Sequence, residues 1–282
     1  MNLQDWIGRS ETVEDTATAT PYAALSATLD QPDTTRPAPG TALPPLWHWL
    51  YFLPLAAQSD IGPDGHAKRG GFMPPVPLPR RMWAGSDFEF HAPLRVGDAL
   101  SRTSTIVDVK EKSGRTGCLI FVKVRHEIRC NGAEEVALTE HHNIVYRAAA
   151  EPGDVAPPPQ AAPADSAWQR TITPSDVLLF RYSALTFNGH RIHYDRKYAT
   201  EVEGYPGLIV HGPLIATLLM DLLRRQQPET RVLRFEFKAV RPTFDTHAFS
   251  VHGQPSPDGK TVHLWGCDHE GWLTMDATAT LA

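Results

Sequence analysis

The sequence predicts an α+β fold made of two similar units, each combining an antiparallel sheet with one long helix. A Pro- and Ala-rich stretch at residues 151–163 has the composition of an extended linker and divides the 282-residue chain near its middle. On each side of it, four runs rich in apolar and β-branched residues are typical of strands. We therefore expect an N-terminal domain at residues 1–150 and a C-terminal domain at residues 164–282.

The expected strands follow one another in each half without intervening long helices. In the N-terminal half they fall at residues 88–90, 100–109, 118–128 and 137–146, with a hairpin turn at 112–115. In the C-terminal half they fall at residues 232–240, 248–252, 260–267 and 272–281. Consecutive strands of this kind favour an antiparallel sheet.

A short internal repeat links the two halves. Phe-Glu-Phe-His-Ala at residues 88–92 corresponds to Phe-Glu-Phe-Lys-Ala at residues 235–239, and each is expected to form the first strand of its sheet. Apolar and charged residues alternate in both, so one face of each strand turns to a core and the other to solvent. The repeat supports two units of the same kind.

Composition and charge favour a soluble, cytoplasmic enzyme. Hydrophobic residues make up 41% of the chain, and the formal net charge of −5 excludes the basic footprint of a nucleic-acid-binding protein. No apolar run reaches transmembrane length, and the first residues lack the pattern of a signal peptide, so no membrane partner is expected. Cys118, Cys130 and Cys267 are odd in number and widely spaced, which indicates reduced core residues.

A helix followed by a crowded polar turn marks the candidate site. Thr173 is the expected N-cap of the helix, which should end near Thr186 because Asn188-Gly189 is a strong turn pair. Four polar residues then fall within six positions: Asn188, His190, Arg191 and His193. Polar groups crowded at a helix end are typical of a functional loop.

A second helix is expected from Gly212 onward. Residues 214–223 are apolar on nearly all sides, which indicates a buried core helix. Gly212 lies near the N-cap and Pro213 at the first position, so the free amides at this end would attract a developing negative charge. In the N-terminal half the apolar run at residues 46–53 is the candidate for a corresponding helix, but the half has no counterpart of the polar turn. We therefore expect one active site per chain, with the N-terminal half shaping its pocket.

These two segments resemble the MaoC-like (R)-specific enoyl-thioester hydratases, which have the hot-dog fold. The family pattern Leu-Ser-Gly-Asp-x-Asn-Pro-Leu-His-x-Asp falls on residues 185–195, where His193 and Asp195 match, Asn188 replaces the catalytic Asp, and His190-Arg191 replaces Asn-Pro. The strings Thr-Phe-Asn-x-His-Arg-Ile-His-Tyr-Asp and Gly-Tyr-Pro-Gly-Leu-x-Val-His-Gly-Pro-Leu resemble the subgroup of mesaconyl-C4-CoA and itaconyl-CoA hydratases and type 2 3-hydroxyacyl-thioester dehydratases. The resemblance implies a double hot-dog whose N-terminal unit is degenerate.

The implied reaction is reversible addition of water to the α,β double bond of an acyl-CoA, with a C5 dicarboxylic acyl group as the expected substrate. His193 is the expected acid–base group, since imidazole titrates near neutral pH. Asn188 would orient the water, and the Gly212 amide would stabilise the enolate oxygen. The expected substrate-binding residues are Arg191, His190, Tyr205 and His211. No metal and no cofactor beyond the coenzyme A of the substrate is expected, and a homodimer is expected.

Several alternatives remain open at this point. The enzyme could instead dehydrate 3-hydroxyacyl groups on acyl-carrier protein or act as a hot-dog thioesterase, and a non-enzymatic alternative is an acyl-CoA-binding protein. Asn188 could only cap the helix or adopt a left-handed turn. Arg191 could form an i,i+4 ion pair with Asp195. For the phosphates of coenzyme A, the pairs Lys68-Arg69 and Arg80-Arg81 are candidate cations.

Overall fold

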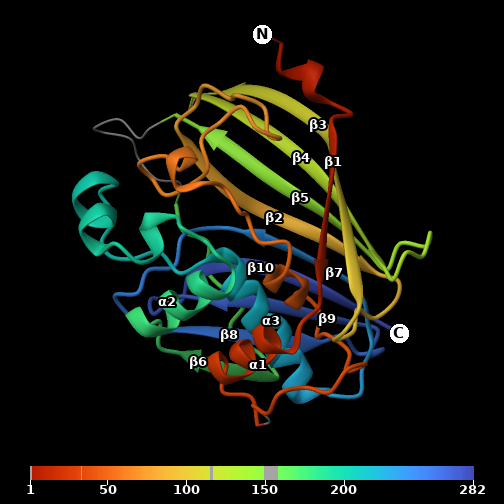
Figure 1. Ribbon diagram of the computed structural model, residues 1–282. Helices are drawn as coiled ribbons and strands as arrows, with labels where there is room; N and C mark the ends of the chain where they lie inside the picture. The colour runs from red at the N-terminus through yellow and green to blue at the C-terminus, as the bar shows by residue number, and fades with distance from the viewer. Residues whose placement is uncertain (1, 33, 115–116, 149–157) are drawn as a thin grey trace.

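Ten strands form one antiparallel sheet in the computed structural model, which describes residues 2–32, 34–114, 117–148 and 158–282 (Figure 1). Its strand order is β1-β3-β4-β5-β2-β7-β10-β9-β8-β6. The strands are β1 (Ser10–Thr16), β2 (Arg80–Phe90), β3 (Ala99–Gly114), β4 (Gly117–Cys130), β5 (Leu138–Arg147), β6 (Trp168–Ile172), β7 (Val232–Ala239), β8 (Phe249–Pro255), β9 (Thr261–Cys267) and β10 (Leu273–Leu281).

The strand order repeats in mirror image about the middle of the sheet. The first five strands belong to the N-terminal half and the last five to the C-terminal half, in matching order, so the prediction of two fused hot-dog units is confirmed. Two details of the prediction were wrong. Strands β1 and β6 precede the repeat strands β2 and β7, and β2 is eleven residues long rather than three. Charged and polar residues dominate β1 and obscure its strand character in the sequence.

The two units join where β2 pairs with β7. The internal repeat meets itself there, because Phe88 lies opposite Phe235 and the ring centroids are 6.1 Å apart. A Cβ at Gly85 would lie 2.2 Å from the carbonyl oxygen of Phe237, so only glycine permits this approach of the two strands. The pairing makes the two sheets continuous within one chain.

The helices are few and mostly short among the described residues. They are α1 (Ala19–Thr28), α2 (Asp176–Leu185) and α3 (Gly212–Gln226), with the short 3₁₀ segments η1 (Leu3–Trp6), η2 (Trp47–Leu50), η3 (Gln58–Asp60) and η4 (Arg191–His193) and the π-helical turn η5 (Tyr198–Val202). Within the described residues, no helix combines the length and the apolar character that a bilayer crossing requires.

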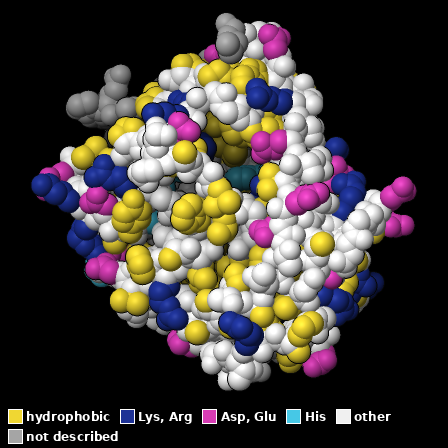
Figure 2. Space-filling model, viewed as in Figure 1, with side chains coloured by type: hydrophobic (Ala, Val, Ile, Leu, Met, Phe, Trp, Pro, Cys, Tyr) yellow, Lys and Arg dark blue, Asp and Glu magenta, His cyan; other side chains and the backbone are white. Residues whose placement is uncertain are grey.

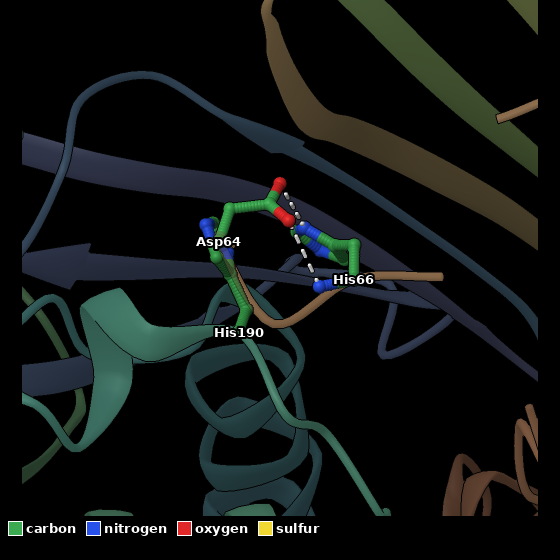
Figure 3. Close-up of side chains that lie close together, drawn as sticks. All are labelled: Asp64, His66 and His190. Carbon is green, nitrogen blue, oxygen red and sulfur yellow. Dashed lines mark hydrogen bonds and ion pairs between the residues drawn. The ribbon is translucent and has the colours of Figure 1, made fainter. Parts of the chain in front are cut away.

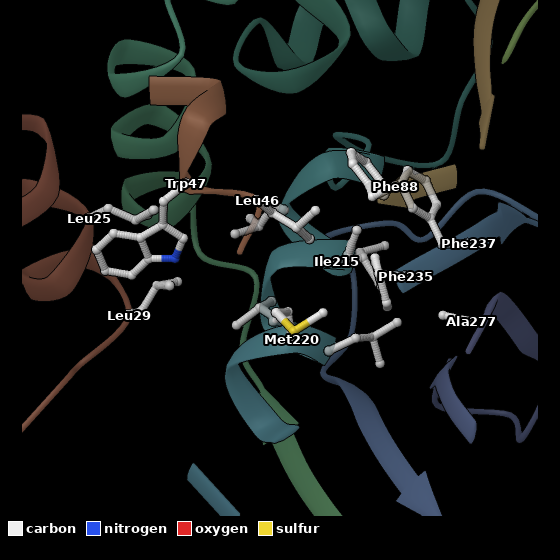
Figure 4. Close-up of a cluster of buried hydrophobic side chains, with 14 of the residues drawn as sticks. Leu25, Leu29, Leu46, Trp47, Phe88, Ile215, Met220, Phe235, Phe237 and Ala277 are labelled. Atoms are coloured by element: carbon white, nitrogen blue, oxygen red, sulfur yellow. The ribbon is translucent and has the colours of Figure 1, made fainter. Parts of the chain in front are cut away.

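Helix α3 is the buried centre of the C-terminal unit. Its residues Leu214 to Leu223 are all buried, as the apolar run predicted, and they pack against β8, β9 and β10. In Figure 4, Ile215 and Met220 of this helix lie between Leu46 and Trp47 on one side and Phe235 on the sheet. The helix begins one position earlier than expected, since His211 is the N-cap and Pro213 is the second helical residue.

Among the described residues, the N-terminal unit has no long helix packed on its own sheet, because its ten-residue α1 contacts mainly α2 and η2. The run at residues 46–53 forms only the four-residue η2, which corrects the expectation of a long helix in each unit. Polar contacts hold this segment on the sheet: the buried carboxylate of Glu140 lies 3.1 Å from His48 Nε2 and accepts hydrogen bonds from Trp49 at 3.3 Å and Ser86 at 3.0 Å. A short anchored segment leaves more of this sheet face uncovered than a helix would.

The proposed domain boundaries stay predictions. Residues 149–157, which include most of the expected linker, and Arg115 of the expected hairpin turn lie outside the described residues. The described end of the linker joins the C-terminal unit, because Ala161 forms a β-bridge with Trp272.

We predict that Phe235→Ala weakens the joint between the units. Phe235 is 1% exposed and packs against Phe88 and Phe237, so truncation leaves a cavity and should lower the free energy of unfolding by about 3–5 kcal/mol. Urea denaturation measures the effect. Phe180→Ala on α2 is the matched control, since Phe180 is 64% exposed and its loss should change stability by less than about 0.5 kcal/mol. Equal losses for the two variants would contradict this account of the joint.

Candidate active site

The end of α2 sets the shape of the polar turn. Ser175, not the expected Thr173, caps the start of the helix by accepting a hydrogen bond from the Leu178 amide at 3.2 Å. The helix ends at Leu185 with Thr186 as C-cap, as predicted. Phe187 then takes the left-handed conformation at φ 49°, and the Asn188 amide donates to the Ser183 carbonyl at 2.8 Å. The left-handed residue is therefore Phe187 rather than Asn188.

Asn188 supports the turn through its side chain. Its Oδ1 atom accepts a hydrogen bond from the His190 amide at 3.0 Å, which is the local geometry that Asn favours in turns. The side-chain nitrogen is then the group that Asn188 would offer to a bound water. The role of Asn188 in catalysis stays a prediction.

His193 is buried and held in one tautomer. Its Nδ1–H donates to the Ile209 carbonyl at 2.7 Å, so the neutral ring carries its lone pair on Nε2. Burial lowers the pKa of His193 to about 4, against the opposing effect of that hydrogen bond, and the nearby His66 lowers it further. The ring is therefore a neutral base at physiological pH.

The start of α3 lies directly beside this ring. The rings of His193 and His211 stack with centroids 3.8 Å apart, and His211 is the residue before Gly212. Ser183 Oγ hydrogen-bonds His211 Nε2 at 2.8 Å and so ties the end of α2 to the start of α3. The amides of Gly212 and Leu214 lie in the first turn of α3, where the helix itself supplies no acceptor. The ring of His193, with its lone pair on Nε2, and the N-terminus of α3 therefore lie side by side.

A loop of the N-terminal unit covers the polar turn. The Arg191 amide donates to the Asp64 carbonyl at 2.9 Å, and the Arg191 guanidinium donates to the Pro63 carbonyl at 2.9 Å. Gly65 lies so close to Gly189 that a Cβ at Gly65 would be 1.8 Å from the Gly189 carbonyl oxygen. The N-terminal half therefore contributes directly to the site.

This loop brings Asp64 and His66 to His190 (Figure 3). Asp64 accepts hydrogen bonds from the His66 ring at 3.1 Å and from the His66 amide at 3.0 Å, and the His66 and His190 rings lie 4.0 Å apart. Burial alone would raise the pKa of Asp64, but these hydrogen bonds lower it overall. Sequence reasoning missed Asp64 and His66; the one local signal for their segment is that residues 61–81 are rich in Gly and Pro.

The same three side chains are the only described group whose positions suit a metal. One ligand atom from each of Asp64, His66 and His190 lies within 4.8 Å of the others. A carboxylate and two imidazoles are common metal ligands. The hydrogen bonds from His66 to Asp64 already satisfy this carboxylate, and the absence of a metal stays a prediction.

The residues expected to bind substrate have different surroundings. Arg191 pairs with Asp195 at 2.7 Å and lies 4.2 Å from the Tyr198 ring, so the alternative of an i,i+4 ion pair is the one observed. Tyr205 lies beside Phe244, with ring centroids 5.9 Å apart, and under Arg80. His190 and His211 both line the row of rings that includes His193.

Comparison with known proteins adds independent support. A family profile described as hydroxyacyl-thioester dehydratase type 2 matches residues 46–245. The mesaconyl-C(4)-CoA hydratase of Chloroflexus aurantiacus is 45% identical over 276 residues, covering 98% of this chain and 96% of that protein. The mitochondrial hydroxyacyl-thioester dehydratase type 2 of Schizosaccharomyces pombe is 28% identical over 248 residues, covering 79% and 81%.

A solved structure from Mycobacterium tuberculosis, described as a double hotdog fold, aligns with a TM-score of 0.59 at 14% identity over 98% of this chain and 96% of that one. The family profile and the similar hydratase together identify this protein as a hydro-lyase, an enzyme that adds or removes water. More narrowly, the chain belongs to the hydroxyacyl-thioester dehydratase type 2 family.

We predict that the buried His193 makes the fold acid-sensitive. An unfolded His titrates near pH 6.5, whereas the pKa of folded His193 is about 4, so the unfolded chain binds more protons between these values. Stability should therefore fall as pH falls through this window, by up to about 1.4 kcal/mol per pH unit for this one group. Urea denaturation from pH 7 to pH 4.5 should show a shallower slope for His193→Gln. His91→Gln, which alters an exposed side chain, should keep the original slope. An unchanged slope in His193→Gln would contradict the assignment.

Proposed function

We propose that this enzyme hydrates a short-chain enoyl-CoA, with a C5 dicarboxylic acyl group such as mesaconyl-C4 or itaconyl as its substrate. The observation that carries the proposal is the neutral His193 ring stacked beside the first turn of α3. Hydration needs both a base for water and a positive site for the enolate oxygen. The similarity to a mesaconyl-C(4)-CoA hydratase over nearly the whole chain supports the acyl class.

In the proposed reaction, His193 Nε2 takes a proton from water while the water oxygen bonds to Cβ. The electron pair of the double bond then moves toward the thioester and forms an enolate, whose oxygen the Gly212 amide stabilises. The imidazolium returns the proton to Cα, which completes the addition of one water. The nearby positive end of α3 favours the negatively charged enolate. The side-chain nitrogen of Asn188 would hold the water in line with Cβ.

A second candidate function is dehydration of 3-hydroxyacyl groups, which is the same chemistry in reverse. The family profile and the similarity to the mitochondrial dehydratase of S. pombe favour this alternative. An acyl-carrier protein is acidic and would need a basic surface beside the pocket. A comparison of CoA and acyl-carrier-protein thioesters as substrates separates the two. The cytoplasmic location and the homodimer expected from the sequence stay predictions.

We predict that His193→Ala lowers turnover by at least roughly 10²-fold, because the variant lacks the base that activates water. The loss of enoyl absorbance measures the rate on mesaconyl-C4-CoA, itaconyl-CoA and crotonyl-CoA. His263→Ala is the control, since His263 is an exposed side chain of β9 that hydrogen-bonds Asp276. Near-normal turnover in His193→Ala would refute the proposed base. Release of free thiol, which hydration of the double bond does not produce, would instead indicate a thioesterase.

A further inference from the structure

Arg81 is an exposed cation of β2 that takes part in no ion pair among the described residues. Two neighbouring arginines form ion pairs, and backbone carbonyls hold a third. Arg80 lies 3.5 Å from Glu203, Arg69 donates to the Val76 and Pro79 carbonyls, and Arg191 pairs with Asp195. Exposed arginines beside a functional site commonly bind anionic groups, because the guanidinium presents several donors in one plane.

The strand register places Arg81 on the inner face of the N-terminal sheet. Arg81 lies opposite Tyr146 on β5, as Phe88 lies opposite Glu140 further along the same two strands. Directly opposite residues of antiparallel strands share a face, and Phe88, Glu140 and Tyr146 are all buried. Burial raises the pKa of Tyr146, and the neighbouring guanidinium of Arg81 acts against that rise. Arg81 therefore stands at the open end of an otherwise buried face.

The same side chain lies close to the candidate active site. Burial lowers the pKa of both His66 and His190, and the positive charge of Arg81 lowers each of them further. The geometry agrees, because Arg69, on the loop that carries Asp64 and His66, lies 5.7 Å from the Tyr146 ring, and Tyr146 lies opposite Arg81. Figure 2 shows a hollow in the molecular surface, with histidine inside it, over the middle of the sheet. The hollow agrees with the face that the short η2 leaves partly uncovered.

Four histidine rings form a row across the candidate site. From the start of α3 outward, His211 stacks on His193 at 3.8 Å, His193 lies 5.4 Å from His190, and His190 lies 4.0 Å from His66. The α3 amides lie at one end of this row, and at the other end lies His66, whose loop reaches Tyr146 opposite Arg81. A thioester bound at α3 would thus extend its acyl group toward Arg81.

We propose that Arg81 binds the free carboxylate of a dicarboxylic acyl group whose thioester oxygen lies at the α3 N-terminus. This assignment rests on the hydratase function proposed above and names the group that selects its substrate. The carboxylate of Asp64 is no competitor, because it already accepts two hydrogen bonds from His66. Arg191, the cation expected from the sequence, is occupied by Asp195.

A substrate panel on Arg81 variants tests the proposal. Arg81→Gln should lower kcat/KM for mesaconyl-C4-CoA and itaconyl-CoA by about 10- to 100-fold, the usual effect of losing a charge-assisted hydrogen bond, and leave crotonyl-CoA within about twofold. Arg81→Lys keeps the charge without the planar donors and should give an intermediate loss. Arg234→Gln on β7 is the control, because the Arg234 side chain is 67% exposed and forms an ion pair with Glu89 at 3.0 Å on the surface.

The outcomes separate this proposal from the function on which it rests. An equal loss for all three substrates would assign Arg81 to the coenzyme A moiety or to folding, and would overturn the proposal. Unchanged rates for the dicarboxylic substrates would also overturn it. The unaltered enzyme could hydrate crotonyl-CoA and show no higher kcat/KM for the dicarboxylic substrates. That result would support the hydratase function and contradict the proposed carboxylate subsite. Thermal melting of each variant identifies a loss caused by misfolding.

Discussion

The site depends on the antiparallel pairing of β2 with β7. This pairing fuses two five-stranded sheets into one, and it requires glycine at residue 85 because the backbones approach too closely for a Cβ. With the two sheets continuous, the loop that precedes β2 lies over the turn that follows α2. Contacts between Asp64 and Arg191 and between Gly65 and Gly189 then hold the two units together at the site. One active centre is built from both halves.

The two units serve different purposes within the same architecture. The C-terminal unit has a long buried helix whose first turn offers amides to an anion, while the N-terminal unit replaces its helix with η2, anchored by Glu140. A short segment covers less of the concave face than a helix of fifteen residues does. In the proposed reaction, the C-terminal unit would supply the reacting groups and the N-terminal unit would supply space for a bulky thioester.

Burial controls the chemistry of the histidines. His193 is neutral because its surroundings disfavour the charged ring, and its Nδ1–H donates to the Ile209 carbonyl, which leaves the lone pair of the ring on Nε2. Such a site does not need an aspartate at residue 188 to select a tautomer. The departure from the hydratase pattern at Asn188 is thus compatible with an active enzyme, and Asn188 instead shapes the turn through His190.

By itself the sequence determined the double hot-dog fold, the buried helix after Gly212, the end of α2 near Thr186 and the clustering of polar residues at 188–193. These features depend on local signals, namely apolar periodicity, turn residues and a specific string, and such signals act between neighbours in the chain. Only the tertiary structure decided that Asp64 and His66 join His190 and that Arg81 forms no ion pair within the described part of the chain, whereas Arg191 takes the i,i+4 partner that the sequence already offered, Asp195. Contacts between residues more than a hundred positions apart depend on how the two sheets join. No local pattern in one segment records which distant side chain will face it.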